Sequence, residues 1–194
     1  MGRKLDLSRY SVLELVQRIQ SRQVAPGCGA AAAVTLALSA ACAGKAVAVT
    51  LKHRPSATAL RRARVRLRGI ARRALAGAER DAESFVGFVR ARDGTSARRL
   101  LHAGESLTAA ARELLGVLGS IEPRVLRRVS ADVSAARALC AAALEIERTN
   151  LAENREALAA SPRALPARSP GGRRSAAPAA ARRRSRRSSP ASDR

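Results

Sequence analysis

Apolar residues recur every three or four positions through most of the first 160 residues, which is the spacing of one face of a helix. The first such segment begins after Ser11. Ser11 and Glu14 have the spacing of a capping box, in which each side chain satisfies a free backbone donor at a helix start. This helix is expected to end near Arg22, before the break at Pro26 and Gly27.

Residues 30–51 form an apolar, alanine-rich run in which Lys45 is the only charged residue. The run is long enough to cross a bilayer. Alanine transfers weakly into lipid, however, and a lysine in the second half of the run would be costly there. We therefore expect a helix that is hydrophobic on all sides and lies buried at the centre of a bundle.

Three more helices are expected. Apolar stripes at residues 67–89 and 100–118 mark the first two, the third runs from about residue 132 to 159, and a connection at 121–130 contains Pro123. Pro55 marks the break before them, with Ser56 as the expected cap. The first of the three has an arginine-rich outer face and is expected to stop near Asp93 and Gly94.

The predicted fold is all-α, a bundle of about five helices around the alanine-rich one. Tyr10, Phe85 and Phe88 are the only aromatic residues, so the core is built from alanine, leucine, valine and isoleucine. Alanine and leucine lead the helix scale, whereas strands favour branched and aromatic residues.

The pattern ends after residue 160, and residues 161–194 consist mainly of proline, alanine, serine and arginine. Such a segment cannot bury enough apolar area to offset its chain entropy. We therefore predict a helical domain over residues 1–160 and a disordered basic tail over residues 161–194. The tail holds ten arginines and one aspartate, but most of the net charge of +22 lies in the domain.

Three cysteines and two histidines are scattered without the spacing of metal ligands. This distribution favours a reducing cytoplasm over a disulfide framework. No apolar stretch of the secretory kind follows the first residues. We expect a cytoplasmic protein without a metal site.

The turn at residues 25–30 (Ala-Pro-Gly-Cys-Gly-Ala) is the first candidate site. Glycines there permit backbone angles that other residues avoid, and they leave the first helical N–H groups open to an anion or a carbonyl. The alternative is a simple tight turn into a buried helix.

Asp132 and Asn150 lie eighteen residues, or five helical turns, apart on one face of the last helix. At about 1.5 Å per residue they are separated by about 27 Å, so they cannot touch one small reacting group within one subunit. They serve opposite ends of a long ligand, meet across a dimer, or one of them is structural. Asp132 is also suited to capping the helix, whereas Asn150 points an amide at an apolar stripe, where it needs partners.

Asp81 borders the apolar stripe of the long helix, and its plainest interpretation is a surface charge paired with Arg73 or Arg80. Lys52 follows the alanine-rich run, where a lysine is expected at a helix C-terminus in any case.

Together these motifs resemble the cyclodeaminase/cyclohydrolase family, which includes the C-terminal domain of formiminotransferase-cyclodeaminase. The family has Pro-Gly-Gly-Gly-Ser at the turn, Asp-Ala-Phe on the long helix, and Ser-Asp followed by Asn-Val-x-x-Asn-Leu at the end. The resemblance covers roughly residues 8–158. The chain departs from it at Cys28, Ala30, Ala131 and Ser134, and it lacks the Gly-Asn upstream of Asp132.

The resemblance implies a folate one-carbon enzyme, either a formimidoyltetrahydrofolate cyclodeaminase or a methenyltetrahydrofolate cyclohydrolase. It implies a homodimer that acts on a tetrahydrofolate derivative with no further cofactor. The basic surface of the chain would favour a polyglutamylated form of this substrate through long-range attraction. A carboxylate would serve as general base or stabilise the cation, with Asp132 and Asp81 as candidates. The implied binding residues are Pro26, Gly27, Gly29, Lys52, Asn150 and Asn154.

Two alternatives remain open. One is a homologue that keeps the fold but has lost turnover, which the departures at Cys28 and Ala30 favour. The other is an arginine-rich helical module that binds nucleic acid non-specifically, at least weakly through its tail. The near-absence of aromatic residues removes base stacking and counts against this second alternative.

Overall fold

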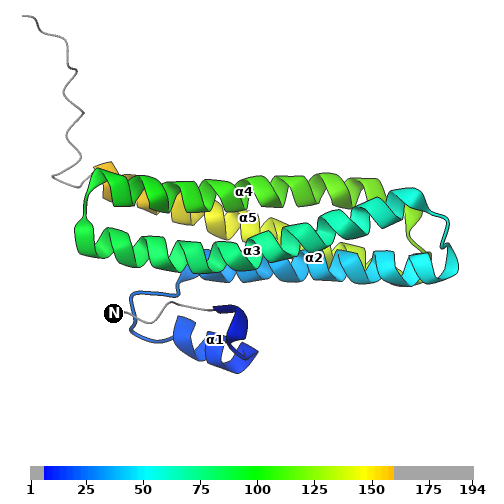
Figure 1. The fold of residues 1–194 in the computed structure, drawn as a ribbon, viewed down its shortest axis with the longest axis horizontal. Coiled ribbons are helices and arrows are strands. Elements are labelled where there is room, and N and C mark those ends of the chain that lie inside the picture. The colour runs from blue at the N-terminus through cyan, green and yellow to red at the C-terminus, as the bar shows by residue number, and fades with distance from the viewer. Residues whose placement is uncertain (1–6, 160–194) are drawn as a thin grey trace, which may run out of the picture. The chain divides into compact units, whose positions relative to one another are not determined.

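The computed structural model describes residues 7–159, which form an all-α bundle (Figure 1). The predicted tail, the domain boundary at residue 160 and the first six residues lie outside these described residues. The helices are α1 (Val12–Ile19), α2 (Cys28–His53), α3 (Thr58–Ala91), α4 (Gly94–Ile121) and α5 (Ser130–Ala159), with short 3-10 turns at Leu7–Arg9, Glu122–Arg124 and Arg127–Val129. The predicted fold class is confirmed.

The four long helices lie side by side in Figure 1, and short connections reverse the chain between them. α2 packs chiefly on α3 and α5, and α4 packs on the same two helices from the other side. The ends of α2 and α5 meet in antiparallel order, because the start of α2 lies near Asn150 and its later part lies near Asp132. This order determines which polar residues share one end of the bundle.

α2 is the buried helix that the apolar run predicts. It is long and apolar enough to cross a membrane, but half of its most apolar stretch is buried inside the bundle. Ala30, Ala33, Ala40 and Ala43 are at most 1% exposed, and such small side chains let neighbouring helices approach closely. Two buried hydroxyl groups of α2 also bond to neighbouring parts of the protein. Ser39 donates to the Ala136 carbonyl, and Thr50 accepts from the Leu126 N–H.

The helix ends differ from the prediction in detail. The capping box of Ser11 and Glu14 is present, but α1 ends at Ile19 rather than near Arg22. Ser56 does not cap α3: the N-cap position is Ala57, which makes no side-chain cap bond. α5 begins at Ser130, so Asp132 lies in its first turn.

Candidate functional site

A small pocket of about 60 Å³ lies where the turn before α2 meets α3 and α5. The turn contributes residues between Val24 and Gly29 other than Pro26, α3 contributes Asp81 and Phe85, and α5 contributes Asn150. Asp81 therefore points inward. The simple interpretation of Asp81 as a surface ion pair is wrong, and Arg73 pairs instead with Glu113 on α4.

Gly29 is required here because of the close approach of Asp81. A Cβ atom at position 29 would lie 2.4 Å from both carboxyl oxygens of Asp81, well inside van der Waals contact. The expected reason for the glycines, an unusual backbone angle, is wrong: no described glycine has a positive φ, and Gly27 is extended with φ −127°.

Asn150 is the centre of a polar network at this pocket. Its Oδ1 accepts from the Cys28 thiol at 3.4 Å and from the Asn154 amide at 3.3 Å, and its Nδ2 donates to Glu147 at 3.3 Å. A hydrogen bond also joins Asn150 to Asp81. The prediction that an amide on this apolar stripe needs partners is confirmed.

Glu147 is a carboxyl that the sequence analysis missed. It is only 1% exposed, and it lies against α4 at Gly104, where a Cβ would come within 2.2 Å of its Oε1. A signal was present in the sequence. Glu147 falls on the stripe of α5 that becomes buried, together with Cys140, Ala143, Asn150 and Asn154, and an acidic residue on such a stripe is unusual.

Both carboxyls are shifted toward the protonated form. Burial raises the pKa of Asp81 to about 6, and the hydrogen bond with Asn150 offsets part of this effect. Burial, together with the nearby charge of Asp81, raises the pKa of Glu147 to about 7. Burial also raises the pKa of the Cys28 thiol, so that this side chain is a neutral donor to Asn150. Groups that titrate near neutral pH are suited to moving protons.

The comparisons with known proteins agree with this geometry. The family model described as formiminotransferase-cyclodeaminase matches residues 11–161. The chain belongs to this family. The formiminotetrahydrofolate cyclodeaminase of Thermotoga maritima has the same fold, with a TM-score of 0.74 and 19% identity over 77% of this chain and 80% of that one. A comparison with curated proteins gives no match.

The residues singled out by the family resemblance separate into two groups. Gly27, Gly29, Asp81 and Asn150 line the pocket, and Asn154 supports Asn150 from the next turn of α5. Pro26 is buried in the turn, where it follows a cis peptide bond. The glycine turn, the Asp81 motif and the two asparagines of this cyclodeaminase-family chain thus meet at one end of the bundle.

Asp132 and Lys52 do not join this group. Asp132 forms an ion pair with Lys45, with 3.6 Å between Nζ and Oδ1, and it lies five turns of α5 from Asn150. Lys52 is exposed in the last turn of α2, about 36 Å along the helix axis from Cys28 at 1.5 Å per residue. Within one subunit of this family member, Asp132 and Asp81 therefore act at separate places.

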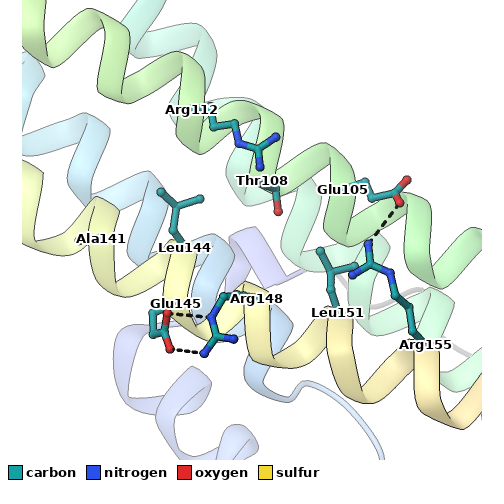
Figure 2. A pocket seen from close by; sticks show the side chains of 9 residues that line it. All are labelled: Glu105, Thr108, Arg112, Ala141, Leu144, Glu145, Arg148, Leu151 and Arg155. Atoms are coloured by element: carbon teal, nitrogen blue, oxygen red, sulfur yellow. Dashed lines mark hydrogen bonds and ion pairs between the residues drawn. The ribbon is translucent and has the colours of Figure 1, made fainter.

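A wider groove of about 700 Å³ runs between α4 and α5 on the outside of the bundle (Figure 2). Its rim carries the ion pairs of Glu105 with Arg155 and of Glu145 with Arg148. Leu151 lines its floor and also packs against Gly104, beside Glu147. Leu151 thus separates the groove from the carboxyl cluster. Among the described residues, no group of three His, Cys, Asp or Glu side chains is placed to hold a metal ion.

Proposed function

We propose that this chain is a folate one-carbon enzyme of the cyclodeaminase type, with its reacting site at the Asp81 pocket. The single observation that carries the proposal is Asp81, which faces the family's glycine turn with a pKa raised to about 6. Its place beside that turn in a chain whose family model spans residues 11–161 supports folate chemistry.

The proposed substrate is 5-formimidoyltetrahydrofolate. The N10 amine attacks the formimidoyl carbon and forms the new C–N10 bond, while Asp81 takes the N10 proton and returns it to the imine nitrogen. Asp81 then takes a second proton from solvent and passes it to that nitrogen, the C–N bond to it breaks, and ammonia leaves with the electron pair of that bond. The 5,10-methenyl cation remains. A carboxyl with a pKa near the working pH can accept the first proton and donate the second.

The second candidate reaction is the hydration of 5,10-methenyltetrahydrofolate. Asp81 would then take a proton from the attacking water, and its charge would stabilise the cationic carbon before attack. Both reactions need the same carboxyl and the same pocket. Turnover of the two substrates by one preparation distinguishes them.

The test is a thermal-shift titration of the full chain with 5,10-methenyltetrahydrofolate, followed by absorbance in the same tube, and a parallel assay of ammonia release from the formimidoyl substrate. A ligand that binds the folded state raises the apparent Tm. Stabilisation with turnover of either substrate supports the proposal. Stabilisation without turnover supports the alternative of a homologue that has lost activity, and the absence of stabilisation contradicts folate binding.

We also propose that the chain acts in the cytoplasm as a homodimer. The exposed apolar face of α1, with Val12 80% and Leu13 66% exposed, supports a partner surface of this kind. Sedimentation of the full chain measures its mass directly.

The binding of a polyglutamylated substrate should weaken as salt increases, because the attraction is between charges. A weak non-specific contact of the tail with nucleic acid would weaken in the same way.

A further inference from the structure

Glu147 is a buried carboxyl whose position the proposed reaction does not yet explain. It is 1% exposed, and it is not among the residues that line the small pocket. Its two oxygens accept from Asn150 Nδ2 at 3.3 and 3.5 Å. Burying a carboxyl costs stability through desolvation, so an apolar residue of similar size would serve a purely structural role better.

Glu147 determines the orientation of the Asn150 amide. The oxygen of this amide faces two donors, the Cys28 thiol and the Asn154 amide. Its nitrogen faces two carboxyls, since it donates to Glu147 and a hydrogen bond also joins Asn150 to Asp81. A flipped amide would place its oxygen against carboxyls and its nitrogen against donors. Only one orientation therefore satisfies every partner.

The packing of α4 against α5 leaves room for the Glu147 carboxyl. Gly104 leaves the space that the carboxyl occupies, because a Cβ there would lie 2.2 Å from Glu147 Oε1 and 2.7 Å from Leu151 Cδ2. Gly29 does the same for Asp81. Two glycines on two helices thus leave the space that two carboxyls near Asn150 occupy.

We propose that Glu147 is a positioning residue for the reaction: it acts through Asn150 to hold the Asp81 carboxyl in the pocket. This inference rests on the proposed function of Asp81. Glu147 itself does not touch the substrate. Its role is to keep Asp81 in place and to make its ionisation depend on that of a second, hidden carboxyl.

The charged groups around Asp81 and Glu147 couple the ionisation of the two carboxyls. The titratable groups that act on the cluster are Cys28 from α2, Asp81 from α3, and Glu147 and Glu153 from α5, while α4 faces it with Gly104. Each of these groups is neutral or acidic. Ionisation of one carboxyl therefore disfavours ionisation of the other.

The first test is an NMR titration of the side-chain carboxyl carbons in the full, ligand-free chain. In the wild type, the carbons of Asp81 and Glu147 should titrate together in two coupled steps. Asp81→Asn should lower the pKa of Glu147, because it removes the neighbouring charge while keeping the side-chain shape. Asp132→Asn, a matched change of an acidic residue about four turns away on the helix of Glu147, should leave the titration of Glu147 as it is.

The second test is the kinetics of Glu147→Gln and of Glu156→Gln, a matched change of an exposed glutamate on the same helix. Glu147→Gln should lower kcat on the order of 10- to 100-fold with little change in KM, because Asp81 is displaced while the binding surface remains. Glu156→Gln should match the wild type in both constants.

These measurements separate the two claims. A Glu147 titration that is the same in Asp81→Asn and Asp132→Asn overturns the inference, and so does a kcat of Glu147→Gln equal to that of Glu156→Gln. A single independent step for Glu147 in the wild type also overturns it, a result that needs no variant to fold. Absence of folate turnover in the wild type overturns the proposed function instead, and the titration then decides whether the two carboxyls are coupled.

Discussion

The two acidic positions of α5, Asp132 and Glu147, belong to one helix but have opposite surroundings. Asp132 has a side chain that is 25% exposed, and it pairs with Lys45, which is 70% exposed. Glu147 is 1% exposed, is held by an amide, and lies near a second carboxyl that raises its pKa. Exposure and partner, rather than residue type, make the first an ordinary surface ion pair and the second part of a buried polar cluster.

The largest expected difference between the two ends is in catalysis. Asp81→Asn keeps the shape of the side chain but removes the base, so turnover should fall by about 10²- to 10⁴-fold. Asp132→Asn, at the other end of the bundle, should cost much less. Steady-state kinetics of both variants measure this contrast. A larger loss for Asp132→Asn would move the reacting site to the Asp132 end, or would place Asp132 across a dimer interface.

The next effect concerns the space beside Glu147. Gly104→Ala should destabilise the chain by about 1–3 kcal/mol, because the new methyl group overlaps Glu147 and Leu151. Gly116→Ala on the same helix meets no atom within 4 Å, so it should stabilise the chain by up to about 1 kcal/mol through helix propensity. Urea unfolding of both variants gives the comparison. Equal changes in the two would show that Glu147 does not need the space at Gly104.

The pH dependence of stability should also distinguish the two ends. The pKa values of Asp81 and Glu147 are raised to about 6 and about 7 in the folded chain, above unfolded values of about 4. The folded state thus holds more protons than the unfolded state in this range, and stability falls as pH rises. Their contribution is fully present below about pH 4 and is lost as pH increases through 6 and 7.

The double variant Asp81→Asn with Glu147→Gln should therefore show a flatter stability profile between pH 5 and pH 8 than the wild type. Denaturant unfolding at several pH values measures the slope, with Asp132→Asn as the control that keeps the wild-type slope. A double variant with an unchanged slope would contradict the raised pKa values.

The smallest expected effect is at the Asp132 end. The ion pair with Lys45 is exposed and 3.6 Å long, and such pairs contribute about 0–1 kcal/mol. Lys45→Met should change the free energy of unfolding by no more than this, and added salt should reduce the difference further. A loss of several kcal/mol in thermal or chemical unfolding would mean that Lys45 has a structural role beyond the pair.

Much of this arrangement could be predicted from the sequence, for definite reasons. Helical spacing predicted the long helices, and the alanine-rich run predicted the buried α2, because burial of an apolar face dominates both patterns. Asn150 was also identified, since an amide on an apolar stripe needs partners. These features depend on one helix at a time.

The remaining features depend on how helices pack against one another. Asp81 lies at the border of an apolar stripe, and the packing of α3 decides whether it faces solvent or the pocket. Glu147 was overlooked because an isolated glutamate in a helix is normally exposed. The need for Gly29 and Gly104 comes from carboxyls on neighbouring helices, which no local sequence pattern contains.

The most direct test of the central claim is an NMR titration of the full chain with 5,10-methenyltetrahydrofolate that follows the backbone and side-chain amides. Signals of Gly29, Asn150 and Asn154 should shift with ligand, while those of Lys45 and Asp132 stay in place. Shifts confined to Lys45 and Asp132 would contradict the claim that the reacting site lies at the Asp81 end of the bundle.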